Sequence, residues 1–255
     1  MEITIYFITF IFGAIVGSFL NVVILRMNTG ESIITGGSRC FNCGKKLGWQ
    51  ELIPVLSFII QGGKCKGCGS KISWQYPIIE VITGIIFLLT FLKLQNTEYL
   101  ILTTGYYFII FSLLIIISAY DFRHQIIPNR LVYLFNILAF LNLFQLSAFS
   151  FQLSAFLSGL ALFAFFGVLW LFSKGKWMGL GDAKLALGIP WLLGACGGVW
   201  AFVFSFWIGA IIGILLMFLA KNKYSMKSRV PFGPFLALGA LLAFSLNGII
   251  SCILV

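Results

Sequence analysis

The sequence predicts an all-α, polytopic membrane protein with about eight transmembrane helices and a small cytoplasmic zinc-binding segment between the first two. Three observations support this fold class. The composition is strongly apolar, uncharged or nearly uncharged stretches long enough to cross a bilayer recur, and the basic residues fall in alternate connecting segments. Hydrophobic residues make up 60% of the 255 residues and charged residues 9%, whereas a soluble domain carries roughly 25% charged residues. Lipid is therefore the expected solvent for much of the surface.

Six apolar stretches reach the roughly 17 residues that a membrane helix needs at minimum. Two of them are long enough for two passes each, with a polar break near 147–154 in one and a glycine-containing break at 194–198 in the other. The first stretch has no basic leader and no small-residue cleavage site, so we expect a retained span. The six stretches are 3–25, 76–92, 99–120, 131–173, 185–220 and 231–255.

The basic residues give the orientation. If the N-terminus lies outside, the cytoplasmic segments are 26–75, 121–130, 174–184 and 221–230, and they hold every one of the 17 Lys and Arg except Lys93. Cytoplasmic loops of membrane proteins carry such an excess of Lys and Arg. Leaving the two long stretches undivided, as six spans, would lose this asymmetry. The net charge of +10 therefore indicates orientation in a membrane and no nucleic-acid partner.

The polar segment 26–75 contains two C-x-x-C pairs, each followed by glycine. Four thiolates suit tetrahedral zinc, with sulfur about 2.3 Å from the metal. Disulfides are rare in the cytoplasm, where the charge pattern places this segment. A structural zinc is the favoured interpretation and a catalytic zinc the alternative, because four cysteines leave no open coordination position. The predicted ligands are Cys40, Cys43, Cys65 and Cys68.

The chain has only two aspartates, Asp121 directly after the third apolar stretch and Asp182 three residues before the long stretch 185–220. Both are predicted at the cytoplasmic membrane boundary, where ionisable groups are costly and often functional. Two converging carboxyl groups share a proton, so one can activate water while the other protonates a carbonyl oxygen, as in aspartic proteolysis. Gly179 and Gly181 would let an extended substrate lie beside Asp182. Placement alone leaves helix capping, an ion pair with Arg123 and proton relay in a transporter open.

Further motifs make the chain similar to a known family along its whole length. It resembles the bacterial type IV prepilin peptidases, the leader peptidase/N-methyltransferases. The ordered set of motifs, beside the four cysteines and the two aspartates, is Gly17-Ser-Phe-Leu-Asn-Val-Val-Ile24, Ile53-Pro-Val-Leu-Ser57, Gly63-Lys-Cys65, Ile72-Ser73, Tyr76-Pro-Ile-Ile-Glu80 and Pro231-Phe-Gly-Pro-Phe-Leu-Ala-Leu-Gly239.

This resemblance implies that Asp121 and Asp182 are the catalytic pair of an aspartic endopeptidase in the bacterial cytoplasmic (inner) membrane. Its substrates would be type IV prepilins or pseudopilins, cut at the cytoplasmic face after the glycine that ends a short basic leader. The resemblance also implies N-methylation of the new N-terminus with S-adenosylmethionine as methyl donor. The corresponding domains are a first transmembrane helix at 1–25, a tetracysteine, methyltransferase-associated segment at 26–75 and a peptidase domain at 76–255.

Three residues are candidates for the methyl-transfer site. Glu51 could bind an ammonium group or be a solvated loop acid, and Gly63 could let the backbone approach a ligand. Glu80 falls inside an apolar stretch and could belong to this site or to an interfacial ion pair.

Two positions depart from the family pattern. Asn129 stands where Asp is usual, and Leu52 where Asn is common. Because Asn caps helices as Asp does, we expect Asn129 to cap the following helix.

Other functions remain open at this point. The chain could be a peptidase without methyltransferase activity, a proton-coupled transporter, or a non-catalytic assembly protein. A transporter often carries an internal repeat, and none is found in this sequence. Membrane lipid is an expected partner, and the oligomeric state does not follow from the sequence.

Overall fold

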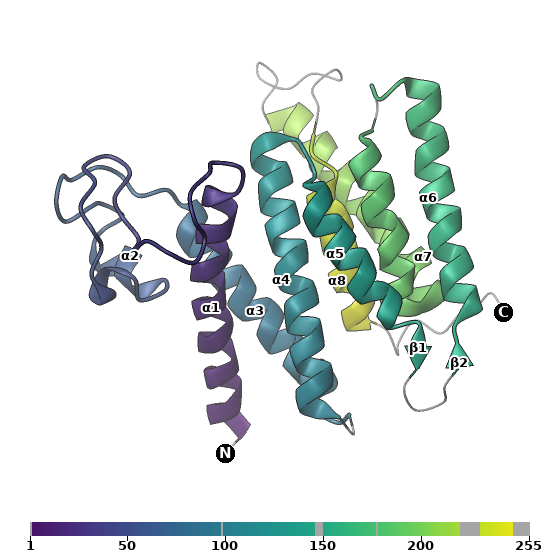
Figure 1. The fold of residues 1–255 in the computed structure, drawn as a ribbon, viewed down its shortest axis with the longest axis horizontal. Helices are drawn as coiled ribbons and strands as arrows, with labels where there is room; N and C mark the ends of the chain where they lie inside the picture. Colours follow the sequence, from purple (N-terminus) through teal and green to yellow (C-terminus); the bar gives the residue numbers. More distant parts are fainter. Residues whose placement is uncertain (1, 98, 146–149, 177, 220–229, 247–255) are drawn as a thin grey trace. The chain divides into compact units, whose positions relative to one another are not determined.

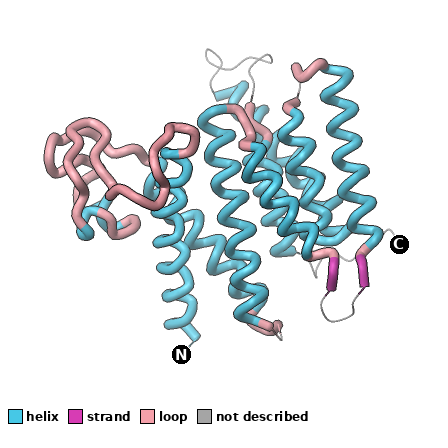
Figure 2. The backbone as a smooth tube through the Cα atoms, in the orientation of Figure 1, coloured by secondary structure: helices cyan, strands magenta, loops and turns pink. Residues whose placement is uncertain are grey.

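A computed structural model describes the chain except residues 1, 98, 146–149, 177, 220–229 and 247–255. The described residues are helical apart from loops and one short hairpin (Figures 1 and 2). In chain order the elements are α1 (Glu2–Arg26), the 3-10 helix η1 (Trp49–Glu51), α2 (Leu56–Ile60), α3 (Gln75–Leu94), α4 (Leu100–His124), α5 (Asn129–Leu141), β1 (Phe144–Gln145), β2 (Ser150–Phe151), α6 (Leu153–Ser173), α7 (Leu180–Leu219) and α8 (Gly233–Leu246).

The prediction of a helical chain with several possible membrane spans is confirmed. Five of the described helices, α1, α3, α4, α6 and α7, are long and apolar enough to cross a membrane, while α5 and α8 are shorter apolar helices. Among the described residues, the strands are those of the antiparallel hairpin β1–β2, in which Phe144 lies opposite Phe151. This hairpin begins just before the predicted break at 147–154, and residues 146–149 of that break lie outside the described part of the chain.

The chain forms two compact units, Met1–Ile116 and Ile117–Val255, with the boundary inside α4. In the first unit α1 packs against α3. A Cβ placed on Gly13 would lie 2.8 Å from the Cα of Gly84, and one on Gly17 would lie 2.8 Å from the Cα of Glu80. Glycines spaced four residues apart on α1 thus let the two helices approach at backbone distance, as small residues do between membrane helices.

In the second unit α7 packs against α5, α6 and α8. Gly194 interrupts α7 with φ 79° and ψ 168°, a conformation essentially restricted to glycine. Beyond it, a Cβ on Gly198 would lie 2.7 Å from the Cα of Pro190. In a straight helix these two residues would be about 12 Å apart along the axis. The chain therefore folds back at Gly194, and the predicted break at 194–198 is confirmed.

Candidate active site and metal centre

Asp121 lies in the last turn of α4 and is 4% exposed. Its Oδ2 accepts a hydrogen bond of 3.0 Å from the backbone N–H of Gly233, the first residue of α8. The partly positive N-terminal end of a helix is a favourable position for a carboxylate. A Cβ at position 233 would lie 2.8 Å from Oδ2 of Asp121, so only glycine leaves room for this contact.

Asp182 is the third residue of α7 and is 7% exposed. Its Oδ2 accepts a hydrogen bond of 3.1 Å from the backbone N–H of Gly179, just before the helix. Its Oδ1 is buried and has no hydrogen-bond partner among the described residues. A buried acceptor left unpaired costs free energy, which makes this oxygen available to a water molecule or a substrate group.

The two carboxyl groups belong to the same unit and lie within electrostatic reach of each other. The ion pairs among the described residues include neither of them, so an ion pair of Asp121 with Arg123 is absent there. Asp182 is not the N-cap of α7, because the helix already begins at Leu180. It reaches back to the residue before the helix, as the acidic member of a capping box does. Two buried carboxyl groups, each held by a backbone amide, can carry out acid–base chemistry together.

The glycines beside Asp182 have local partners. Gly179 supplies the amide described above, and a Cβ on Gly181 would lie 2.8 Å from the Cβ of Ile127 in the loop after α4. Gly181 therefore lets the two aspartate-bearing segments pack together. The sequence-based expectation that these glycines make room for a substrate has no support in these contacts.

Asn129 does not cap α5, contrary to the expectation from the sequence. Pro128 occupies the N-cap, and no side chain caps the helix. The side chain of Asn129 instead accepts a hydrogen bond of 2.9 Å at Oδ1 from the Nζ of Lys184. Asn129 thus connects the start of α5 to α7, two residues after Asp182. The sequence could not predict this role of Asn129, because local rules do not describe a contact between residues 55 positions apart.

The four predicted zinc ligands come together in the first unit. The Sγ atoms of Cys40, Cys43, Cys65 and Cys68 all lie within 4.8 Å of one another. Tetrahedral zinc with bonds of about 2.3 Å requires sulfur atoms roughly 3.8 Å apart, and Cys40 and Cys68 are 3.9 Å apart. The donor set and its geometry therefore fit a metal ion.

Two matching turns position these cysteines. Cys40 donates its N–H to the Lys45 carbonyl, and Cys65 donates to the Ser70 carbonyl, each at 2.9 Å. The glycine after each pair has a left-handed φ, 71° at Gly44 and 69° at Gly69, which a residue with a Cβ rarely adopts. The motif C-x-x-C-G thus folds twice in the same way, and the two copies face one another.

The neighbours of the four thiols shift their pKa values in opposite directions. Hydrogen bonds from the hydroxyl and the backbone amide of Ser70 lower the pKa of Cys68 to about 6, which favours the thiolate that metal binding needs. A backbone hydrogen bond from Lys45 lowers the pKa of Cys43, but hydrogen bonding to Cys68, desolvation and the nearby Cys40 outweigh it and raise that pKa to about 11. Without a cation, the crowded sulfurs therefore favour the protonated thiol at Cys43, and a bound metal ion would replace that proton.

Each methyl-transfer candidate has a close neighbour in the first unit. Glu51 accepts hydrogen bonds of 3.0 Å from both Lys45 Nζ and the Gly48 N–H. Its side chain is 9% exposed, so Glu51 is not a solvated loop acid. These two contacts, that of Gly48 first, lower its pKa. Gly63 has φ 66°, and a Cβ there would lie 3.1 Å from the ring of Phe58.

Glu80 is buried and anchors the loop before α2. Its Oε2 accepts a hydrogen bond of 2.7 Å from the Val55 N–H. Val55 has φ 62° and ψ −51°, and the Leu56 N–H bonds the Pro54 carbonyl across it, which makes a strained γ-turn. A β-branched residue in this conformation is an outlier that its surroundings must hold in place. Glu51, Gly63 and Glu80 thus each have a contact within the protein itself.

Comparison with protein families gives the class of enzyme to which the chain belongs. Two family models match adjoining parts of the chain: the Bacterial Peptidase A24 N-terminal domain at residues 11–94 and the Type IV leader peptidase family at residues 108–214. The first match contains the four cysteines and the second contains both aspartates. The chain is therefore an enzyme of the A24 peptidase class.

Curated relatives refine this assignment. The chain is 37% identical over 238 residues to the prepilin leader peptidase/N-methyltransferase of Bacillus subtilis, covering 93% of this chain and 92% of that protein. It is 32% identical to the protein of the same name from Vibrio cholerae, covering 94% and 96%, and 30% identical to that of Pseudomonas aeruginosa, covering 92% and 88%. No solved structure matches significantly. The chain belongs to the prepilin leader peptidase/N-methyltransferase family, as its motifs predicted.

Gly233 is a site residue to which the sequence assigned no role. It lies inside the motif Pro231-Phe-Gly-Pro-Phe-Leu-Ala-Leu-Gly239, which contributed to the resemblance. The signal available was a glycine directly before Pro234 at the start of an apolar stretch, which indicates a helix start where backbone amides are free. Nothing in the sequence connects that start to Asp121.

Proposed function

We propose that this chain is an aspartic endopeptidase that removes the leader of type IV prepilins or pseudopilins and then N-methylates the new N-terminus. The observation that carries the cleavage activity is the pair of buried carboxyl groups of Asp121 and Asp182, each hydrogen-bonded to a backbone amide. No positively charged side chain neutralises either group among the described ion pairs.

In the proposed reaction the two carboxyl groups share one proton. The ionised group removes a proton from a water molecule as its oxygen attacks the scissile carbonyl carbon, and the protonated group donates its proton to the carbonyl oxygen. Collapse of the tetrahedral intermediate breaks the C–N bond, and the amine leaves with a proton from the carboxyl that took one from water. The other carboxylate takes a proton from a hydroxyl of the intermediate, which becomes the new carboxyl group, and the pair again holds one proton. The unpaired Oδ1 of Asp182 is our candidate for the atom that faces this water.

We infer eight membrane crossings and a cytoplasmic catalytic face. The crossings are α1, α3, α4, α5, α6, the two halves of α7 and α8, with the N-terminus outside. This arrangement keeps all Lys and Arg but Lys93 in cytoplasmic segments. We place the enzyme in the bacterial cytoplasmic membrane, assign cleavage to the part of the chain that bears the aspartates, within the proposed peptidase domain 76–255, and assign metal binding to 26–75.

We further propose that the four cysteines bind one structural zinc ion, and that the segment holding them supports methyl transfer. The ligands would be the thiolates of Cys40, Cys43, Cys65 and Cys68. When bound, the ion would join the two C-x-x-C turns and hold the loop between them, which carries Glu51 and the Val55 turn. S-adenosylmethionine is the proposed methyl donor, and Glu51, Gly63 and Glu80 remain the candidate residues near it.

The cleavage proposal is tested with purified protein and a prepilin, with the products read by mass spectrometry. Asp121→Asn and Asp182→Asn should each lower the cleavage rate at least about 10²-fold, the range for loss of a general acid or base. Glu31→Gln, which changes an exposed acid in the cytoplasmic segment, is the control and should cleave normally. Wild-type cleavage by either aspartate variant would refute the catalytic pair.

A further inference from the structure

Lys184 is a basic residue without an acidic partner in the part of the chain that the structure describes. Its Nζ donates hydrogen bonds to Asn129 Oδ1 at 2.9 Å and to the Tyr133 hydroxyl at 3.1 Å, and it lies 5.2 Å from the centroid of the Tyr133 ring. These partners are all neutral, and the ion pairs among the described residues do not include Lys184. An unpaired ammonium group at a membrane boundary favours an anionic partner.

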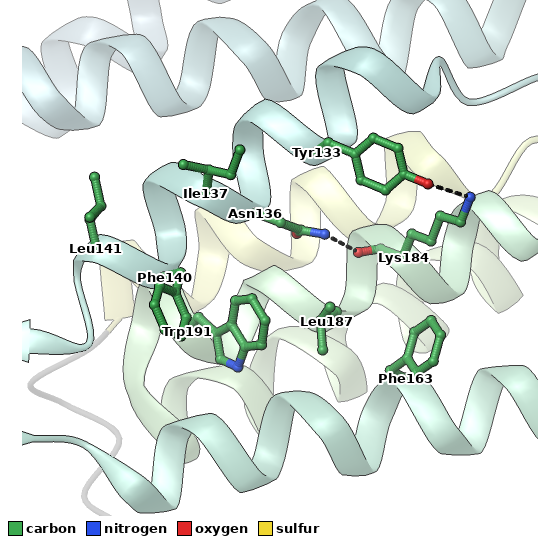
Figure 3. A pocket seen from close by; sticks show the side chains of 9 residues that line it. All are labelled: Tyr133, Asn136, Ile137, Phe140, Leu141, Phe163, Lys184, Leu187 and Trp191. Carbon is green, nitrogen blue, oxygen red and sulfur yellow. Dashed lines mark hydrogen bonds between the residues drawn. The ribbon is translucent and has the colours of Figure 1, made fainter.

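An apolar groove of about 650 Å³ extends from this lysine. Figure 3 shows Lys184 and Tyr133 at one end and Leu141, Phe140 and Trp191 toward the other. Lys184 and Trp191 are seven residues apart on α7, about 10 Å along the helix axis. Ile137, on the α5 wall, is 60% exposed, so the groove is open. Its apolar lining is formed by Ile137, Phe140, Leu141, Phe163, Leu187 and Trp191.

One positive charge at the end of an open apolar groove matches an amphiphile with an anionic end and a hydrocarbon chain. In the proposed topology Lys184 lies at the cytoplasmic boundary, where anionic headgroups gather, and the groove runs into the hydrocarbon region. We propose that this groove binds one anionic phospholipid, with its phosphate at Lys184 Nζ and an acyl chain along α5 and α7. This site goes beyond the peptidase and methyltransferase activities and requires neither.

Comparing three ligands shows whether the groove recognises an anionic lipid, any phospholipid or phosphate alone. Purified full-length protein in detergent is titrated with dioleoylphosphatidylglycerol, dioleoylphosphatidylcholine or inorganic phosphate, and bound ligand is counted by native mass spectrometry. Phosphatidylglycerol should bind at least about fivefold more tightly than phosphatidylcholine, since one lysine near anionic lipid contributes about 1 kcal/mol. Phosphate alone should not bind detectably. Equal binding of the two lipids, or saturable binding of phosphate, would overturn the proposal.

Four variants test the geometry. Lys184→Gln removes the charge. Asn129→Asp keeps the lysine but places a carboxylate at its Nζ, so it remains informative if Lys184→Gln does not fold. Both should abolish the preference for phosphatidylglycerol. Ile137→Trp should fill the groove and weaken binding of both lipids. Arg130→Gln, which changes a basic residue beside Asn129 that does not line the groove, is the matched control.

Two results with these proteins would contradict the site. If Arg130→Gln lowers lipid binding as much as Lys184→Gln does, the attraction is a general surface effect. If a prepilin peptide displaces bound phosphatidylglycerol in proportion to its occupancy, the groove is a substrate site and the lipid assignment fails. Retention of the lipid at saturating peptide supports a separate lipid site.

Discussion

Both aspartates are positioned by backbone amides of glycine. Gly233 donates to Asp121 and Gly179 donates to Asp182. A hydrogen bond to a carboxylate fixes its orientation, and an amide does so without bringing a full positive charge. The pair can therefore still exchange protons, which a lysine or arginine partner would hinder by holding the carboxylate ionised.

Gly233→Ala should reduce prepilin cleavage about 10²-fold, because displacement of a catalytic group by about 1 Å can have that effect. The added Cβ would lie 2.8 Å from Oδ2 of Asp121, so either the carboxylate or the start of α8 must move. Initial cleavage rates measured by mass spectrometry, with thermal stability measured alongside, provide the check.

Gly167→Ala is the matched control, since a Cβ at this helical glycine would meet nothing within 4 Å. It should leave the cleavage rate unchanged. If Gly233→Ala cleaves as fast as Gly167→Ala, then the contact between α8 and Asp121 does not position the catalytic group.

Some of the candidate site residues can be predicted from the sequence, and others cannot. The aspartates and cysteines stand out because carboxylates are rare in apolar chains and because C-x-x-C spacing brings two thiolates to one ion. Gly233 and Lys184 do not, since their partners Asp121 and Asn129 are distant in sequence. The γ-turn at Val55 was equally unpredictable, because local propensity disfavours it and the buried Glu80 holds it in place.

At the scale of elements, the reversal inside α7 brings Gly198 against Pro190. Hydropathy could predict two passes in 185–220, because lipid requires long apolar helices and glycine is the residue that permits a reversal. It could not predict the β1–β2 hairpin that follows α5. The aromatic contact between Phe144 and Phe151, with ring centroids 5.4 Å apart, forms across that hairpin and depends on its register.

Gly194→Ala should lower the free energy of unfolding by about 1–3 kcal/mol, the range for a residue forced into a glycine-only conformation. The reason is the φ of 79° and ψ of 168° at this position, not crowding, because a Cβ there would meet nothing within 4 Å. Unfolding in mixed detergent micelles measures the change.

Gly213→Ala makes the same substitution in the second half of α7, where the backbone is helical and space is free. It should leave stability unchanged or raise it by up to about 1 kcal/mol. Equal stability of the Gly194→Ala and Gly213→Ala proteins would be inconsistent with a strained turn at 194.

For the whole molecule, the cysteines and the aspartates belong to different compact units, Met1–Ile116 and Ile117–Val255. The sequence suggested a different division, at residues 25 and 75, because polarity marks membrane boundaries and does not mark which helices pack together. If each unit carries one of the proposed activities, then the two activities should be separable by substitution.

Cys65→Ser should remove most of the bound zinc and lower methylation while cleavage continues. Asp182→Asn should stop cleavage but still methylate a pilin that has already been cut. Zinc content by elemental analysis and product masses with and without S-adenosylmethionine measure both effects.

Phe41→Ser is the control for the cysteine variant, since this 73% exposed side chain lies in the same C-x-x-C turn and supplies no sulfur. It should retain its zinc. Full methylation by a Cys65→Ser protein that has lost its zinc would rule out a role for the metal in methyl transfer.

The shortness of α5 and of the first half of α7, which carries Asp182, has a consequence for the surrounding bilayer. α5 has 13 residues, about 20 Å of helix, and the first half of α7 is similarly short, whereas the hydrocarbon layer is about 30 Å thick. Lipid next to short helices compresses to match them. If α5 and the first half of α7 cross the membrane as proposed, we expect the bilayer to be locally thin there, which would shorten the path by which water and a leader peptide reach the carboxyl groups from the cytoplasm.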